Sequence, residues 1–371
     1  MAKYLHQYSN WPNFTWESDQ LLPLLSLVRN KQGRLIGKMA ALGFNLRNEA
    51  NLEILTEEIL KSTEIEGETL EKEQVRSSIA KRLGLEVSGL VHSNHNVDGI
   101  VDLMLDAIGF FDQELTKKRL LSWHASLFPG GQSGMFPIIT GNWRDDSLGP
   151  MQVVSGAMGK EQVHFQAPQA HLLEDEMHQF FDWFNKDNEI DSVLKAGVAH
   201  LWFLTLHPFE DGNGRIARAL TDMLLARSDE QSYRFYSMSV QIRKERNAYY
   251  LHLEKSQKGE LDITAWLEWF LTCLLHAITH SDELLEKIIV KHFFWLEHRR
   301  TVLNERQHKI LNKLLDGFEG VLNTTKWAKM GKCSQDTALR DIQDLIEKGV
   351  LIKSPEGGRS TNYVLKLAEE L

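Results

Sequence analysis

The feature that most constrains this 371-residue chain is the run His-Pro-Phe-Glu-Asp-Gly-Asn-Gly-Arg-Ile-Ala-Arg at positions 207–218. Small residues let backbone N–H groups converge on phosphate oxygens, and a helix that begins just after them adds the positive end of its dipole. The apolar residues Ile216, Leu220 and Leu224 then recur at helical spacing. The run therefore predicts an anion-binding loop that opens into a helix.

Charged and titratable side chains surround this predicted loop. Arg215 and Arg218 are three residues apart and share one helical face, where paired guanidinium groups suit a polyphosphate. A neutral His207 can take the proton from an incoming hydroxyl. Either Glu210 or Asp211 can hold Mg²⁺, which prefers one or two carboxylates together with phosphate oxygens. A helix-loop-helix with solvated charges is the alternative, and it requires no such combination of residues.

The run resembles the Fic signature His-Pro-Phe-x-Asp/Glu-Gly-Asn-Gly-Arg-x-x-Arg, with an acid directly after Phe209. The resemblance implies a protein adenylyltransferase that moves AMP from ATP to a Tyr, Thr or Ser hydroxyl of a target protein. It assigns the base to His207 and Mg²⁺ to Glu210. It also implies that the loop holds the α-phosphate and that the two arginines meet the β- and γ-phosphates, through Gly212, Asn213, Gly214, Arg215 and Arg218.

The identity of residue 214 bears on the group that is transferred. One Fic-like branch phosphorylates its target and carries a lysine at this position, whereas this chain has Gly214. The resemblance therefore favours AMP transfer over phosphorylation. Two alternatives remain open: removal of AMP from a modified target, and a transcription regulator that uses the pocket only to sense nucleotide.

A second motif, Ser-Thr-Glu-Ile-Glu-Gly at positions 62–67, resembles the Ser/Thr-x-x-x-Glu-Gly/Asn motif of Fic proteins with an N-terminal inhibitory helix. Ser62 and Glu66 are four residues apart and share a helical face, and Gly67 can end that helix. We expect Glu66 to pair with Arg218 and to keep it from the γ-phosphate, so that the enzyme restrains itself. The alternative is a solvated glutamate on a helix surface.

Residues 128–168 are rich in glycine, proline and short β-branched runs, at 138–140, 151–155 and 163–165. This pattern predicts an extended loop with a β-hairpin. In the Fic family such a hairpin is a flap that binds the target backbone as an added strand. The expected docking edge is Met151, Gln152, Val153 and Val154.

Tyr249 and Tyr250 follow the predicted loop in a segment that resembles the lining of the Fic adenine pocket. Both rings could pack on the base. A pair of tyrosines in a helix is as readily explained as ordinary core.

Composition bounds the partners and the compartment. A net charge of −9 argues against a surface that coats nucleic acid or anionic membrane as a whole. The two cysteines, Cys273 and Cys333, lie far apart and indicate neither a disulfide framework nor a zinc site. The most apolar stretch, 266–278, is short and carries Glu268, so no membrane partner is expected and a cytoplasmic location is predicted.

The last part of the chain predicts three helices, at 305–315, 326–330 and 334–348, and then a hairpin with its turn at 355–358. This order describes a winged helix-turn-helix. Its mildly positive charge is compatible with DNA, although Asp336, Asp341, Asp344 and Glu347 on the presumed recognition helix would repel phosphates. Protein docking is the other interpretation of this module.

The expected fold class is mainly α: a Fic-type helical bundle with a β-hairpin flap, an N-terminal helical region and a C-terminal winged helix-turn-helix. The corresponding ranges are 1–94 for the N-terminal region with the inhibitory helix, 95–295 for the catalytic domain and 296–371 for the winged helix. Dissociation of a homodimer and binding of the target are both candidate ways of releasing Glu66.

Overall fold

A computed structural model describes residues 4–85, 89–147, 149–156, 160, 162–187, 190–315, 317–318, 320–354 and 361–367. The chain divides into two compact units, Met1–Ser281 and Asp282–Leu371. The division falls within helix α11 (Thr264–Glu297). The three domain ranges expected from the sequence stay a prediction.

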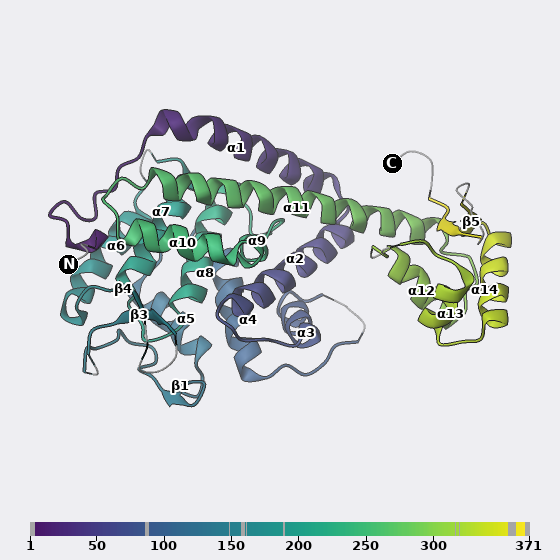
Figure 1. Cartoon of the computed structure of the whole chain (residues 1–371), viewed down its shortest axis with the longest axis horizontal. Coiled ribbons are helices and arrows are strands. Elements are labelled where there is room, and N and C mark those ends of the chain that lie inside the picture. The colour runs from purple at the N-terminus through teal and green to yellow at the C-terminus, as the bar shows by residue number, and fades with distance from the viewer. Residues whose placement is uncertain are drawn as a thin grey trace. The chain divides into compact units, whose positions relative to one another are not determined.

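The first unit is mainly helical, and its elements are labelled in Figure 1. Its helices are α1 (Ser18–Ala41), α2 (Phe44–Ile65), α3 (Lys72–Arg82), α4 (His95–Gly109), α5 (Lys117–Leu127), α6 (Leu173–Asn185), α7 (Ser192–Leu206), α8 (Asn213–Asp229), α9 (Met238–Lys244), α10 (Arg246–Gln257) and the first part of α11. Short 3-10 helices occur at Leu5–Gln7 and Ala170–Leu172. The predicted helical character of this region is confirmed.

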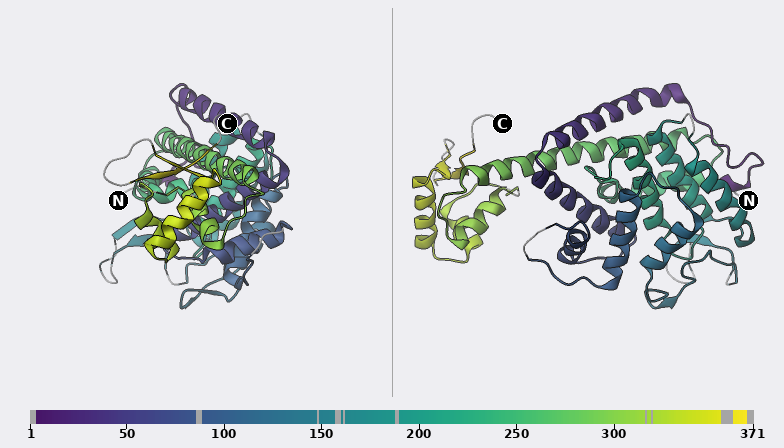
Figure 2. Two further views of the ribbon diagram at one scale, coloured as in Figure 1. Left: turned by 90° about the vertical axis from the view of Figure 1, so that its right-hand side faces the viewer. Right: turned by 180° about the vertical axis from the view of Figure 1, so that it is seen from behind.

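Helix α7 is the centre of the first unit. Every residue from Val193 to Leu206 is buried, and the helix packs along α8. On another side it approaches α11 closely, where Trp266 donates its indole N–H to the carbonyl of Gly197 at 2.8 Å. Helix α1 lies beside the N-terminal part of α11 in both opposite views (Figures 1 and 2), and the two are joined by a bond from Gln20 Nε2 to Glu268 Oε2 at 3.3 Å. The segment that ends in His207 is thus held on all sides.

Two short antiparallel hairpins lie between α5 and α6. One pairs β1 (Gln132–Ser133) with β2 (Phe136–Pro137), and the other pairs β3 (Gln152–Ser155) with β4 (Gln162–Gln166). The predicted runs at 151–155 and 163–165 contribute to the second hairpin. The β-branched run 138–140 forms no strand, because its backbone is used elsewhere: the Ile139 N–H donates to the carboxylate of Glu210.

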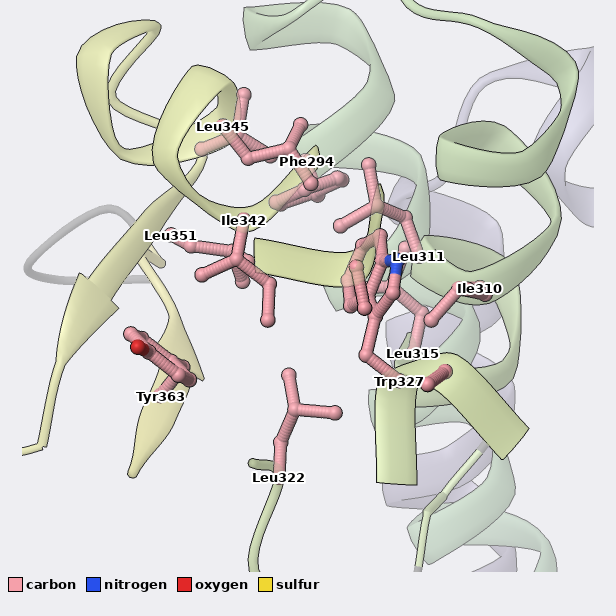
Figure 3. Close-up of a cluster of buried hydrophobic side chains, with 13 residues drawn as sticks. Phe294, Ile310, Leu311, Leu315, Leu322, Trp327, Ile342, Leu345, Leu351 and Tyr363 are labelled. Atoms are coloured by element: carbon pink, nitrogen blue, oxygen red, sulfur yellow. The ribbon is translucent and has the colours of Figure 1, made fainter. Parts of the chain in front are cut away.

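The second unit contains the rest of α11 and α12 (Glu305–Leu315), α13 (Thr324–Gly331) and α14 (Gln335–Glu347), followed by the antiparallel pair β5 (Leu351–Lys353) and β6 (Tyr363–Leu365). Its core gathers apolar side chains from each of these elements around Trp327 and Ile342 (Figure 3). Ser334 caps α14 by accepting the Thr337 N–H at 3.2 Å, as its sequence suggested. The predicted turn at 355–358 lies outside the described residues. Within the described parts of both units, no helix is long and apolar enough to cross a membrane.

One expectation about α14 is wrong. The sequence places Asp341 among the acids that a phosphate backbone would meet, but the residue is only 5% exposed. Its carboxylate accepts two bonds from the Arg306 guanidinium, at 2.6 and 2.9 Å, and one from the Trp327 indole at 3.2 Å. Asp341 therefore joins α12, α13 and α14 inside the unit. Of the other acids, Asp336 and Glu347 are exposed.

The contact between α4 and α5 gives a stability prediction. A Cβ on Gly99 would lie 1.8 Å from the carbonyl oxygen of Ser126, which is backbone and has little room to move. We expect Gly99→Ala to lower the free energy of unfolding by about 1–3 kcal/mol, because the helices must separate. Gly109→Ala on the same helix is the matched control, since a Cβ there meets nothing within 4 Å. The free energy of unfolding of both variants is measured in urea. Equal values for the two variants would contradict this packing.

Candidate active site

The loop between α7 and α8 has a backbone that few residues accept. His207 ends α7 in the left-handed region, with φ 48° and ψ 56°, and its N–H bonds to the carbonyl of Phe203 at 2.9 Å. Gly212 precedes α8 with φ 81°, and a Cβ there would lie 2.9 Å from the ring of Phe128. Both the conformation and the close ring require glycine at this position. The loop therefore turns sharply and presents His207 at one end and the start of α8 at the other.

Asn213 closes the loop from inside. Its side-chain oxygen accepts the N–H of Phe209 at 3.0 Å, and its amide donates to the carbonyl of the same residue at 2.7 Å. The side chain is thus engaged in the scaffold. Since the first N–H groups of a helix have no intrahelical acceptor, an anion here would meet the backbone amides of residues 213–215, just before the first α8 bond from Ile216 to Gly212.

His207 is chemically suited to accept a proton. Its Nδ1 lies 3.3 Å from the carbonyl oxygen of Leu204, which can only accept, so Nδ1 carries the hydrogen and Nε2 has the free lone pair. Burial lowers the pKa of His207 to about 4, and nearby Arg144 acts in the same direction. The imidazole is therefore neutral near pH 7.

Arg144 is a site residue that the sequence analysis missed. It is 3% exposed and binds two consecutive carbonyl groups at the start of the loop: Nε donates to the carbonyl of His207 at 2.7 Å, and the backbone N–H donates to the carbonyl of Pro208 at 2.9 Å. A third bond runs from Nη2 to the carbonyl of Pro168 at 2.6 Å. Arg144 thereby ties the loop to the segment that leads into α6.

His124 is a second residue that the sequence analysis missed. Its ring stacks on Phe209 at 4.0 Å between centroids, and its Nδ1 accepts the N–H of Gly141 at 3.0 Å. Nε2 must then carry the proton, which it donates to the carbonyl of Asp211 at 3.2 Å. The ring is completely buried and bridges α5 to the loop only in its neutral form.

This bridge predicts a dependence of stability on pH. Burial lowers the pKa of His124 to about 4, below the ordinary value of 6.5. As the pH falls, His124 is therefore protonated in the unfolded chain before it is protonated in the folded chain. Its contribution to the free energy of unfolding is complete above pH 6.5 and is lost as the pH falls towards 4. We expect the free energy of unfolding to fall by up to about 3 kcal/mol through this group.

Other buried histidines also affect stability in this pH range, so wild type is compared with His124→Gln, which lacks only the His124 ring. Urea unfolding at about pH 7 and about pH 4.5 should show the stability gap between wild type and variant narrowing at the lower pH. An equal gap at both values would contradict the assignment of a neutral ring to His124.

The two acids of the loop have different surroundings. Glu210 accepts the Ile139 N–H on Oε2 at 2.7 Å, and its other oxygen has no partner among the described residues. Asp211 is held by the hydroxyl of Ser133 and by the N–H of Gly212. Glu210 therefore offers the freer oxygen for a cation. A single carboxylate oxygen suits an ion that takes its other ligands from phosphate and water. Within the described residues, no three His, Cys, Asp or Glu side chains gather into a metal cluster.

Arg215 and Arg218, the two arginines in the first turns of α8, are buried with unsatisfied donors. Arg215 packs its guanidinium over the ring of Phe128, 5.0 Å from the centroid, and Arg218 is 2% exposed. Arg215 Nε and Arg218 Nη1 have no hydrogen-bond partner among the described residues. Buried donors of this kind are costly unless a partner arrives, so the pair is suited to binding an anion.

Glu66 reaches Arg218 from α2. The distance between Glu66 Oε1 and Arg218 Nη2 is 2.7 Å, and the guanidinium side chain is 1% exposed. Ser62 completes the contact, because Arg218 Nε donates to its hydroxyl at 2.8 Å and Nη2 donates to its carbonyl at 2.9 Å. Burial opposes the charge of Arg218, but the carboxylate of Glu66 together with nearby Tyr249 and Tyr250 outweighs this effect, and the pKa of Arg218 is raised.

The start of α8 leaves room for this carboxylate. A Cβ on Gly214 would lie 2.0 Å from Glu66 Oε1. Any side chain at this position would therefore displace Glu66 from Arg218. The glycine serves two purposes here: it exposes the backbone amides and admits the carboxylate.

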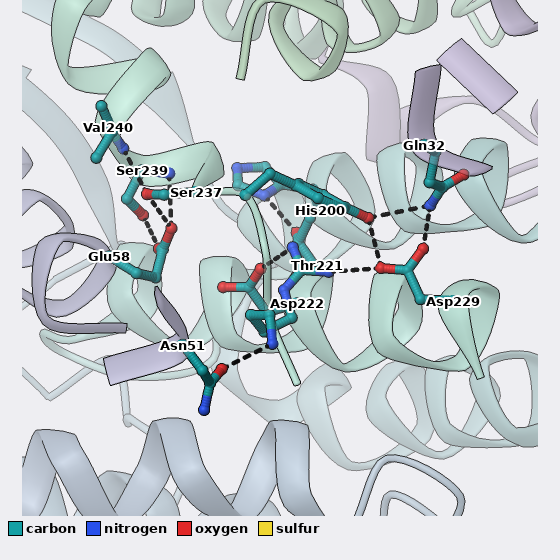
Figure 4. Close-up of polar contacts among 12 residues, drawn as sticks. Gln32, Asn51, Glu58, His200, Thr221, Asp222, Asp229, Ser237, Ser239 and Val240 are labelled. Carbon is teal, nitrogen blue, oxygen red and sulfur yellow. Dashed lines mark hydrogen bonds and ion pairs between the residues drawn. The ribbon is translucent and has the colours of Figure 1, made fainter. Parts of the chain in front are cut away.

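Helix α2 is locked against the segment that leads into α9 (Figure 4). The carboxylate of Glu58, which is 2% exposed, accepts the hydroxyl of Ser237 at 2.6 Å and the N–H of Ser239 at 3.0 Å. Asn51, about two turns before Glu58 on α2, accepts the N–H of Arg234 at 3.0 Å. These bonds fix the rotation of α2 about its axis.

That rotation determines where Glu66 points. Glu58, Ser62 and Glu66 follow one another at intervals of four and so lie on one face of α2. Fixing Glu58 therefore directs Ser62 and Glu66 towards Arg218.

The remaining predicted residues lie in two places. Tyr249 is 2% exposed, its hydroxyl bonds to Nε2 of His200 at 3.0 Å, and its ring packs against Trp266 and Trp269, whereas Tyr250 is 38% exposed. Of the predicted adenine-pocket pair, only Tyr250 has an accessible ring. Residues 152–154 lie on β3, which pairs only with β4 among the described strands.

Comparisons with known proteins agree with this geometry. Residues 114–225 match the Fic/DOC family, and residues 4–85 match a domain of unknown function, DUF4172. The protein adenylyltransferase Fic of Drosophila willistoni is 28% identical over 60% of this chain and 41% of its own length. The protein adenylyltransferase fic-1 of Caenorhabditis elegans is 25% identical over 64% of this chain and 45% of its own length. The chain thus spans less than half the length of these relatives.

Solved structures are similar in fold. A Fic family protein from Desulfovibrio desulfuricans has a TM-score of 0.51 at 21% identity and covers 94% of this chain and 98% of its own. A Fic domain containing signaling protein from Bacteroides thetaiotaomicron has a TM-score of 0.52 at 19% identity, over 70% of this chain and 97% of its own. The mainly helical fold around the loop is therefore of the Fic type.

Proposed function

We propose that this chain, whose residues 114–225 match the Fic/DOC family, is a protein adenylyltransferase that moves AMP from ATP to a hydroxyl of a Tyr, Thr or Ser side chain. The observation that carries the proposal is the neutral His207 at the rim of an anion loop that is flanked by two buried arginines. The names of the related adenylyltransferases support it.

The proposed reaction is a displacement at the α-phosphorus of ATP. The target's hydroxyl oxygen forms a bond to that phosphorus while Nε2 of His207 takes the hydroxyl proton. The bond from the α-phosphorus to the bridging oxygen breaks, and pyrophosphate leaves with the electron pair. A general base typically contributes roughly 10²–10⁴-fold to the rate of such a step.

The other residues hold the nucleotide in this proposal. In the loop Gly212, Asn213 and Gly214, the free backbone amides of Asn213 and Gly214 receive the α-phosphate, because the Gly212 N–H is bonded to Asp211. Arg215 binds the β-phosphate and Arg218 the γ-phosphate. Glu210 would hold Mg²⁺, which supplies charge neutralisation at the phosphates when bound. Tyr250, as the exposed member of the tyrosine pair, would contact the base.

We also propose that Glu66 restrains the enzyme. Arg218 cannot serve the carboxylate and the γ-phosphate together, because the carboxylate occupies its Nη2 and carries like charge to the phosphate. With Glu66 in place, ATP is held in an unproductive pose. The hairpin of β3 and β4 would receive the target as an added strand beside β3.

For the C-terminal unit we propose the winged helix-turn-helix class, on the basis of three helices followed by a strand pair. DNA binding has weak support. The exposed residues of α14 include Arg340 and Gln343 but also Asp336 and Glu347, so this helix offers no net positive surface.

The transferred group is tested with ATP labelled at either the α- or the γ-phosphate. The Glu66→Gly variant is incubated with Mg²⁺, labelled ATP and extract proteins, and label on protein is measured. Label from the α-position alone is expected. Label from the γ-position would indicate phosphorylation, and no label from either position would contradict a transferase.

A further inference from the structure

A second carboxylate, two residues after Glu66, engages Arg215. Glu68 Oε2 lies 3.3 Å from Arg215 Nη1. The arginine side chain is 6% exposed, whereas that of Glu68 is 51% exposed. The end of α2 thus covers both guanidinium groups that the proposed function assigns to phosphates: Glu66 on Arg218 and Glu68 on Arg215.

The helix end explains how two residues so close in sequence face the same way. Positions two apart on a continuous helix point in different directions. Here Glu66 is the C-cap that follows the last helical residue, Ile65, and Gly67 turns the chain back with φ 89°. The N–H of Gly67 bonds to Glu64 at 3.1 Å and that of Glu68 to Thr63 at 3.3 Å, which is the Schellman pattern. The turn therefore returns Glu68 towards α8.

Glu68 has space to leave Arg215. Both residues line a cavity of about 420 Å³, together with Asn96, Gln132 and Ser133. The other acid near Arg215 is Asp211, whose carboxylate is 3.9 Å from Nη2 and is held by the hydroxyl of Ser133. Glu68 is thus the half-exposed partner that an incoming anion can displace.

We infer that Glu68 is a second restraining residue, which keeps Arg215 from the β-phosphate as Glu66 keeps Arg218 from the γ-phosphate. The inference rests on the proposed function, because it needs a nucleotide at this loop. The restraint then depends on the number of phosphates in the nucleotide. Glu68 opposes the binding of ADP and ATP but does not affect the binding of AMP, whereas Glu66 opposes the binding of ATP in particular.

The test measures by calorimetry the affinities for AMP, ADP and ATP in the presence of Mg²⁺. The proteins are wild type, Glu68→Gln, Glu66→Gly and the control Glu73→Gln. Glu73 is an exposed glutamate of α3, so its substitution makes the same change in net charge. For Glu68→Gln we expect the affinity for ADP and for ATP to rise about twofold to fivefold, the upper part of the range of a partly exposed ion pair, and the affinity for AMP to stay unchanged. Glu66→Gly should raise the affinity for ATP more than the affinity for ADP.

Three outcomes overturn the inference while nucleotide binding stands. The first two are no gain in ADP affinity with Glu68→Gln and an equal gain with Glu73→Gln. A gain that is the same for AMP as for ADP would also overturn it, because AMP has no β-phosphate for Arg215. If none of the three nucleotides binds any variant, the proposed function fails and the inference fails with it. Thermal unfolding of Glu68→Gln verifies that the variant is folded.

Discussion

Replacing His207 by asparagine is expected to reduce AMP transfer by about 10²–10⁴-fold, the usual contribution of a general base. Asparagine suits the test because it tolerates the left-handed backbone that residue 207 adopts, with φ 48°. It has no basic nitrogen, however, to take the hydroxyl proton. The measurement is transfer of α-phosphate label in the Glu66→Gly background.

The nucleotide should still bind this variant, because the anion loop and both arginines are unchanged. Calorimetry should therefore give an ATP affinity within about threefold of the parent, a difference of less than ~1 kcal/mol. His178→Asn is the matched control, since that side chain is 77% exposed on α6 and should leave transfer unaffected. Retained turnover in His207→Asn would show that another group is the base.

Replacing Glu66 by glycine is expected to raise AMP transfer by about tenfold to a hundredfold. A hydrogen bond from a charged group is worth roughly 1.5–3 kcal/mol, and the γ-phosphate gains such bonds to Arg218 once the carboxylate is gone. The variant should also be less stable without nucleotide, because the buried guanidinium loses its counter-ion. Added ATP should then raise its Tm more than it raises that of wild type.

Glu64→Gly is the control for this variant. It places the same glycine two residues earlier on α2, where the native carboxylate pairs with Lys61 at 2.7 Å and lies away from Arg218. Its transfer rate should equal that of wild type. Equal rates in wild type and Glu66→Gly would remove the inhibitory role.

The sequence predicted those parts of the site that are contiguous or regularly spaced. The loop followed by a helix is indicated by the residue types of the run 207–218, and the face shared by Ser62 and Glu66 follows from their spacing. The structure pairs Glu66 with Arg218, and Ser62 adds a contact that the sequence did not predict. Arg144 and His124 could not be found this way. Each is a single polar residue far along the chain from the loop, and its role depends on packing that no local pattern encodes.

Roles within a recognised motif were also incompletely predicted. The resemblance assigns Asn213 to a phosphate, but its side-chain oxygen and amide both bond to the backbone of Phe209. Asp341 was expected on an exposed face and is instead buried against Arg306. Helical spacing shows which residues share a face, whereas the choice of an outward or inward face depends on the partner that tertiary packing provides.

The central claim is that Arg218 is shared between an inhibitory carboxylate and the nucleotide. The most direct measurement is a pair of crystal structures, wild type and Glu66→Gly, each with ATP and Mg²⁺. The claim predicts that the γ-phosphate contacts Arg218 in Glu66→Gly only, with the α-phosphate on the loop beside His207, while Glu66 still pairs with Arg218 in wild type. The same triphosphate position in both crystals would contradict it.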